Sequence, residues 1–163
     1  MDPTILARQL AMACAAGTEA ALKPLVAEFG FADPRRSAAN LKLLHAVVPD
    51  CSLLAAVALA ALQTADPDLA LNSLEQLTNT AWQNELLAVL GSERERRQLL
   101  TVLGASPFLT GILCRKPDHF HDLFAAGELR RAKDEATMLA ELRQRIPSEA
   151  TFAELQKGLR LYK

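Results

Sequence analysis

Three side chains of the kinds that bind soft metal ions lie close together in the sequence, at Cys114, His119 and His121. A zinc site needs a third and a fourth ligand at a recognisable spacing, and the sequence supplies none. The two histidines are two positions apart, so on one helix they would point to different faces. The pattern favours boundary histidines and a core cysteine, and it predicts no metal site.

A second candidate for chemistry is the run Gly91-Ser92-Glu93-Arg94-Glu95. It has the outline of the Gly-Ser…acid-x-acid site of nucleotidyltransferases, in which a Gly-Ser turn holds phosphates and two Asp on a strand bind magnesium. Here residues 96–100 indicate a helix, and the alternating Arg would place positive charge where the metal should lie. Ser92 and Glu95 instead fit a capping box, S-x-x-E before an apolar run. The run therefore predicts a helix N-terminus.

Basic side chains could form a docking surface, at Arg94, Arg96, Arg97, Arg130, Arg131 and Lys133. Their acidic neighbours nearly cancel them, which favours a solvated face. His45 has no matching acid or nucleophile nearby in the sequence, and we assign it no role. The chain also lacks the G-x-S-x-G, H-E-x-x-H, G-x-x-x-x-G-K and G-x-G-x-x-G motifs. We therefore predict no catalytic, cofactor-binding or metal-binding residues.

Composition indicates a helical, soluble, cytoplasmic protein. Half of the residues are hydrophobic but only 5% are aromatic, and Ala and Leu head the helix-propensity ranking. A net charge of −1 gives no pull toward nucleic acid or an anionic membrane, so neither is expected as a partner. The three cysteines imply no disulfide framework, and the N-terminus has no secretory signal. The most apolar run, 51–62, is far shorter than the ~20 residues of a membrane span.

Helix start and stop signals follow one another along the chain. They predict an all-α fold of about ten short to medium helices packed as antiparallel hairpins. The expected N-caps are Asp2, Thr18, Asp33, Asp50, Asp66, Ser106 and Ser148, and the expected breaks lie at Gly17, Gly30, Pro49, Gly91, Gly104–Pro107, Pro117, Gly127 and Pro147. Residues 1–163 are expected to form one helical domain. The last helix is still in amphipathic register at Lys163, so we expect the chain to be a fragment of a longer protein.

Asp-Pro pairs begin at Asp2, Asp33 and Asp66, at nearly even spacing. Leucines stand eight residues after each Asp, which is compatible with helical hairpins of about 33 residues stacked in a HEAT-like array. The alternative is that Asp-Pro, a good helix opener, is simply used three times. The HEAT-like interpretation predicts three equivalent hairpins, so the packing of these helices distinguishes it from the alternative.

The stretch from Leu99 to Phe124 has the densest pattern of short apolar helices. One stripe is expected at Leu99, Leu100 and Leu103, a second at Phe108, Leu109, Ile112 and Leu113, and a third at Phe120, Leu123 and Phe124. We expect this stretch to be core. Phe108 in particular is expected to be a buried anchor.

This stretch resembles the N-terminal helical region of bacterial glutamine synthetase adenylyltransferase/adenylyl-removing enzymes. That family carries a leucine-rich helix, then Gly-x-Ser-x-Phe-Leu, then a Leu-x-x-x-Pro segment. The matching residues here are Gly104, Ser106, Phe108, Leu109, Leu113 and Pro117. Upstream, Asp66, Pro67, Ala70, Asn72 and Leu74 are similar to the family's Asp-Pro-…-Ala-…-Asn-x-Leu segment. Residues 155–163 resemble the start of the helix that leads into the first nucleotidyltransferase domain. The resemblance covers residues 60–163, and residues 1–60 are a helical extension without a match.

The resemblance implies a role in bacterial nitrogen regulation. Such enzymes move AMP from ATP onto a tyrosine of glutamine synthetase, and a second domain removes it by phosphorolysis. Both activities use Gly-Ser…Asp-x-Asp sites with magnesium, and this chain contains neither motif. The resemblance therefore implies a non-catalytic segment of a transferase whose full-length form uses ATP and Mg. Its implied partners are the downstream nucleotidyltransferase domain, glutamine synthetase and a nitrogen-signalling regulatory protein. A stand-alone helical-repeat interaction module is the alternative.

Overall fold

The computed structural model describes residues 3–16, 18–80, 83–120, 123–124 and 134–162. Every regular element in these ranges is helical, which confirms the all-α prediction. The helices are α1 (Pro3–Ala16), α2 (Glu19–Phe29), α3 (Pro34–Val47), α4 (Cys51–Ala61), α5 (Pro67–Thr78), α6 (Gln83–Gly91), α7 (Glu93–Ala105), α8 (Pro107–Arg115), α9 (Pro117–Phe120), α10 (Glu135–Arg145) and α11 (Phe152–Tyr162). The chain divides into two compact units, residues 1–127 and 128–163, and each is described by itself. One helical domain, with an extension over residues 1–60 and a family-like region over residues 60–163, stays a prediction.

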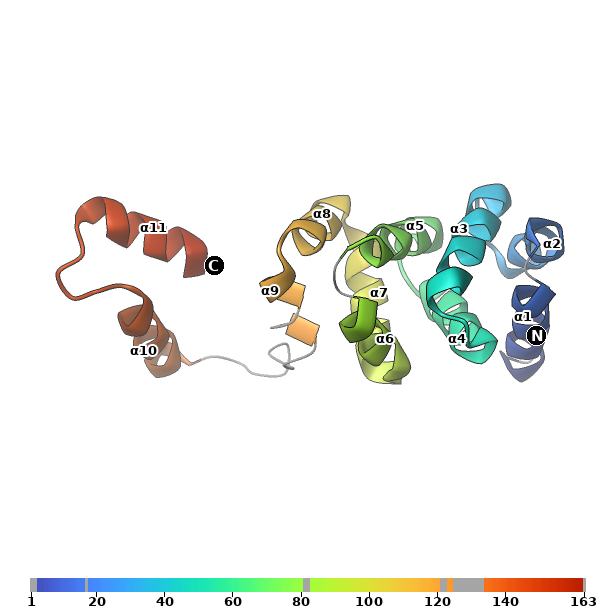
Figure 1. The fold of residues 1–163 in the computed structure, drawn as a ribbon, viewed down its shortest axis with the longest axis horizontal. Coiled ribbons are helices and arrows are strands. Elements are labelled where there is room, and N and C mark those ends of the chain that lie inside the picture. Colours follow the sequence, from blue (N-terminus) through green and yellow to red (C-terminus); the bar gives the residue numbers. More distant parts are fainter. Residues whose placement is uncertain (1–2, 17, 81–82, 121–122, 125–133, 163) are drawn as a thin grey trace. The chain divides into compact units, whose positions relative to one another are not determined.

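The helices of the first unit are arranged in two layers (Figure 1). One layer contains α2, α3, α5 and α8, and the other contains α1, α4, α6 and α7. Helix α1 packs against α4, whereas α3 packs against α2 and α5. The helix that follows Asp2 therefore lies in a different layer from those that follow Asp33 and Asp66. Three equivalent hairpins are not observed, and HEAT-like packing is not confirmed.

The core between these layers is built mainly from leucine and alanine. Its fully buried leucines are Leu10, Leu22, Leu41, Leu44, Leu54, Leu71, Leu74, Leu77, Leu86, Leu90, Leu99, Leu100 and Leu103. Helix α4 adds Ala55, Ala58 and Ala61 to the same core. Small side chains let neighbouring helices approach α4 closely from both layers. The buried positions include Leu41 and Leu44 of α3 and Ala70, Leu74 and Leu77 of α5, which recur at helical spacing.

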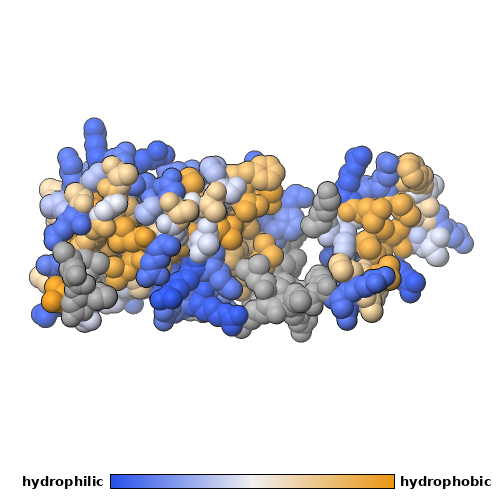
Figure 2. All heavy atoms as spheres, turned by 180° about the vertical axis from the view of Figure 1, so that it is seen from behind, coloured by the Kyte–Doolittle hydropathy of each residue, from blue (hydrophilic) through white to orange (hydrophobic). Residues whose placement is uncertain are grey.

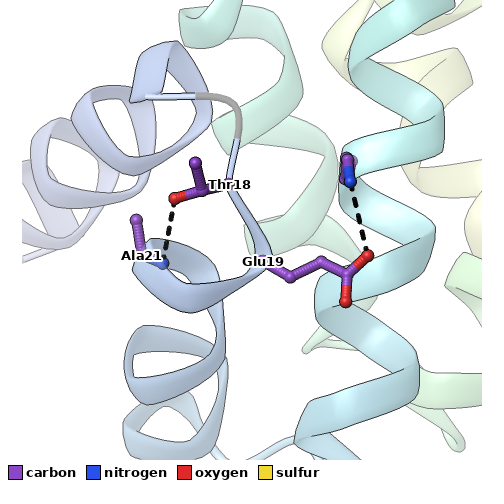
Figure 3. Close-up of polar contacts among 4 residues, drawn as sticks. Thr18, Glu19 and Ala21 are labelled. Atoms are coloured by element: carbon purple, nitrogen blue, oxygen red, sulfur yellow. Dashed lines mark hydrogen bonds and ion pairs between the residues drawn. The ribbon is translucent and has the colours of Figure 1, made fainter.

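Side-chain caps begin most helices where the sequence predicts them. Thr18 Oγ1 accepts from the Ala21 amide at 3.3 Å, beside an exposed Glu19–Lys42 ion pair (Figure 3). The predicted capping bonds are also present at Asp33, Asp50, Asp66 and Ser106. Each satisfies an amide that the first turn of a helix leaves without an intrahelical partner. Gly30 ends α2 with φ +100°, a left-handed conformation that glycine adopts without strain. The expected Asp2 cap and the Gly17 and Gly127 breaks lie outside the described residues.

Two predicted caps differ from the structure. Ser92 lies at the N-cap of α7, but its side chain makes no capping hydrogen bond, so the expected capping box is wrong in that respect. The last helix begins after Thr151, not after Ser148, because residues 147–150 form a turn closed by a bond from the Ala150 amide to the Pro147 carbonyl. Thr151 and Glu154 form the capping box there, with the Thr151 amide donating to Glu154 at 2.8 Å.

A polar bridge joins α3 to α5 within the first unit. Asp68, in the first turn of α5, accepts from the Ala32 amide at 2.8 Å, the Asp33 amide at 3.3 Å and the Ser37 hydroxyl at 2.6 Å. Its carboxylate therefore binds the chain just where α3 begins. One turn along, a guanidinium nitrogen of Arg36 donates to Asn72 at 2.8 Å. These bonds fix the register between two neighbouring helices of one layer.

No single helix in the described residues is long and apolar enough to cross a membrane. Helices α7 and α8 reach the required length and composition only as a pair, and the break between them bends the chain by 117°.

Candidate functional site

The cysteine and histidines singled out for metal binding do not form a site in the described part of the chain. Cys114 lies half-buried in α8, His119 lies in α9, and His121 is outside the described residues. Burial raises the pKa of the Cys114 thiol, and the charge of Arg115 offsets part of that rise. No group of three His, Cys, Asp or Glu side chains in the residues described could hold a metal ion. The same result applies to magnesium, so we derive no metal-dependent step from the described residues.

The arginines around the start of α7 have different roles. Arg96 is partly buried, and its guanidinium donates to the Leu90 carbonyl at 2.6 Å, which satisfies a free acceptor at the end of α6. Burial lowers the pKa of this guanidinium. Arg97 pairs with Glu93 at 2.8 Å on the exposed surface, as the solvated-face interpretation predicts. Arg130, Arg131 and Lys133 lie outside the described residues, so a continuous basic surface stays untested.

The apolar stripe predicted on α8 is not all core. Leu113 is buried, but Phe108 is 70% exposed and Leu109 is 40% exposed, so the expectation of a buried Phe108 is wrong. The buried face of α8 instead runs through Thr110 and Leu113, three positions apart, where the helix packs on α5 and α7. Adjacent residues on a helix are about 100° apart, so the four-residue stripe was wider than the face that the neighbours cover. Phe108 and Leu109 therefore form an apolar surface.

Five of the residues that carry the family resemblance, all between positions 104 and 113, divide into two groups. Three have structural roles: Gly104 packs closely against the loop between α4 and α5, Ser106 is an N-cap, and Leu113 is buried. Phe108 is 70% exposed and Leu109 is 40% exposed, so neither belongs to the buried core of the described residues. Large exposed apolar side chains need a reason beyond folding when several gather together.

The second unit also presents an apolar surface. Helices α10 and α11 form a hairpin in which the Tyr162 hydroxyl donates to Glu141 at 2.8 Å and Arg145 lies over the Tyr162 ring at 5.7 Å. Gly158 lets Ile146 approach α11 closely. No residue of α10 is buried, and the exposed apolar side chains are Met138, Leu139, Phe152, Leu155 and Leu159. Figure 2 shows apolar atoms at the surface of both units. We call these five exposed apolar residues of the hairpin the hairpin face.

The structure brings together one pair that the sequence did not connect. Cys51 Sγ lies 3.4 Å from Nε2 of His45, and the two residues stand on opposite sides of the turn between α3 and α4. The two residues are six positions apart in the sequence, whereas neighbours on one helix face are three or four apart. The signal that could have found the pair is the predicted turn at Pro49 and Asp50, which folds the chain back between them.

No family model, curated protein or solved structure matches the chain.

Proposed function

We propose that the chain is a non-catalytic helical segment of an enzyme that adenylylates and deadenylylates glutamine synthetase in nitrogen regulation. In this role it packs against the nucleotidyltransferase domain, which carries the ATP and Mg chemistry. The sequence of residues 60–163 supports the proposal through the resemblance given above. The observation that carries the docking role is the hairpin face.

The second unit is of a size at which a core of its own usually does not suffice for stability. Units below about 40 residues usually need disulfides, metals or a partner. Residues 128–163 fall in that class, and in the described part of the unit Phe152 is 75% exposed. Burial of Phe152 against a partner would stabilise the unit by up to roughly 1.5–3 kcal/mol, and complete burial of the half-exposed Leu155 and Leu159 would add less for each side chain. We propose that this partner is the nucleotidyltransferase domain that the resemblance places after this helix.

A titration tests the docking role. The 163-residue chain is titrated with the separately expressed first nucleotidyltransferase domain of a family member, and binding is measured by calorimetry. We expect Leu159→Asp to weaken binding at least tenfold, because it places a charge in the buried face. Ala153→Asp adds the same charge on another side of α11 and is the matched control. Equal affinities for the two variants would refute the docking role.

The coding sequence past codon 163 tests the family assignment. We expect it to contain two Gly-Ser…Asp-x-Asp motifs, and a stop codon at that place would refute the assignment. We also expect the purified chain to transfer no AMP to glutamine synthetase. Magnesium-dependent ATP turnover by the chain alone would contradict this expectation.

A stand-alone interaction module is the second candidate. The side-by-side packing of α3 and α5, both opened by Asp-Pro and joined through Asp68, favours it. The different layer of α1 counts against a regular array. Stable binding of an extended peptide or helix to the first unit alone, with no nucleotidyltransferase domain encoded downstream, would favour this candidate over the first.

A further inference from the structure

Cys51 and His45 form a thiol–imidazole pair at the junction of two helices. Cys51 is the first residue of α4, and His45 lies in the last turn of α3. Their Sγ and Nε2 atoms are 3.4 Å apart, within hydrogen-bond reach for sulfur. The Pro49 carbonyl lies 3.8 Å from the same sulfur. Both residues are half-buried.

The surroundings of the pair decide which group acts on the thiol. The first amides of α4, which would favour a thiolate, are already bound by the carboxylate of Asp50 at 2.8 and 3.3 Å. Nε2 of His45, 3.4 Å from the sulfur, is the basic atom placed to accept the thiol proton. A second thiol, Cys14 of α1, also lies near: burial, and then the charge of Cys51, raise its pKa to about 11.

We propose that Cys51 is a nucleophilic thiol, activated by His45, and that it is a site of covalent modification by small electrophiles such as hydroperoxides. The Cys51 proton passes to Nε2 of His45, and the thiolate attacks one oxygen of hydrogen peroxide. An S–O bond forms as the O–O bond breaks, and the leaving hydroxide takes the proton from the imidazolium to become water. Sulfur is oxidised to sulfenic acid and peroxide is reduced. A base next to the thiol is the arrangement that activates cysteine nucleophiles elsewhere.

The chain contains its own controls for this chemistry. Cys114 is also half-buried, but burial raises its pKa and no histidine is within hydrogen-bond reach of its sulfur in the described residues. Cys14 is 1% exposed, so it should remain unmodified while the chain is folded. Its protection therefore reports on folding in the same experiment.

Competitive alkylation tests the proposal. The full chain is treated with limiting iodoacetamide at pH 7, where the thiolate displaces iodide from carbon, and each cysteine is quantified by peptide mass spectrometry. We expect Cys51 to react about tenfold or more faster than Cys114, as for a thiol with an adjacent base. His45→Gln should remove this advantage, and His119→Gln should leave it unchanged. Hydrogen peroxide followed by a sulfenic acid trap should label Cys51 in the wild type and not in Cys51→Ser.

Two results would overturn the proposal: a Cys51 rate no higher than that of Cys114, or a rate that His45→Gln leaves unchanged. If Cys14 becomes reactive in His45→Gln, that variant is unfolded. His45→Phe then replaces it, because this substitution keeps a ring of similar size and removes both nitrogens. Retention of the fast Cys51 reaction in that folded variant would equally overturn the proposal.

Discussion

Gly104 of α7 packs closely against the loop between α4 and α5. A Cβ there would lie 2.7 Å from Thr64 Oγ1, 2.8 Å from Thr64 Cβ and 3.1 Å from the Asp66 carbonyl oxygen. In an exposed helix, Gly→Ala stabilises by about 1 kcal/mol. At Gly104 that gain is opposed by a clash with a neighbouring loop, so the sign of the effect depends on whether the loop can move.

The loop is held in place by its own bonds. Thr64 is β-branched, so its side chain is stiff, and its hydroxyl donates to the Ala61 carbonyl at 2.7 Å. The Asp66 carbonyl accepts from the Ala70 amide at 3.0 Å, in the first turn of α5. Overpacking of this kind costs about 1–3 kcal/mol, and losing the Thr64 bond costs about 1 more. After the gain in helix propensity is subtracted, Gly104→Ala should lower the free energy of unfolding by about 2 kcal/mol.

Urea denaturation followed by far-UV circular dichroism measures this difference. Gly91→Ala is the matched control, since no atom lies within 4 Å of the added carbon, and it should leave stability unchanged or raise it. Thr64→Ala removes one clashing atom, so the double variant should recover about 1 kcal/mol through coupling. A Gly104→Ala protein as stable as the wild type would refute the close-packing argument.

Three further predictions concern single side chains. Asp68→Ala should lower the free energy of unfolding by about 2–3 kcal/mol, because three donors at the start of α3 lose their acceptor. Glu19→Ala is the control: it removes only an exposed ion pair and should cost at most about 1 kcal/mol. Urea melts with equal losses for both variants would contradict this prediction. Phe120→Ala should lower the free energy of unfolding by about 3–5 kcal/mol, because its ring is fully buried, 5.3 Å from that of Phe124. Phe108→Ala should lower it by less than about 1 kcal/mol, because that ring is largely exposed. A larger loss for Phe108→Ala than for Phe120→Ala in urea melts would contradict the burial of these rings. Thr151→Ala should cost about 1 kcal/mol of local stability, seen as faster amide hydrogen exchange in the first turn of α11. Ser148→Ala should leave that exchange unchanged, and the opposite pattern would restore Ser148 as the cap.

Local signals in the sequence were enough to predict most helix starts. Asp33, Asp50 and Asp66 bind amides two or three residues ahead, so the pattern that predicts them lies within a few positions. Buried leucines on α3 and α5 are equally local, because one face of each helix repeats at regular spacing. The cap at Ser148 failed for a similar reason: two overlapping start signals lie a few residues apart, and the Pro147 turn selects the later one.

Features that depend on the packing of neighbouring helices could not be predicted from local sequence signals. Phe108 belongs to an apolar stripe, yet its exposure depends on where α5 and α7 lie around α8. Gly104 was expected only as part of a helix break, while its tight contact with Thr64 comes from another part of the chain. The pairing of His45 with Cys51 requires the angle at which α3 turns into α4. Sequence patterns specify which residues favour a helix, but not which faces other helices leave open.

The alanines of α4 bear on the order in which the first unit folds. Alanine has the highest helix propensity and loses no side-chain entropy on burial, so α4 orders at a lower entropic cost than the leucine-rich helices around it. It also packs against α1 and α7 in its own layer and against α3 and α5 in the other. A helix that forms readily and contacts both layers is suited to be the folding nucleus, with the other helices condensing onto it.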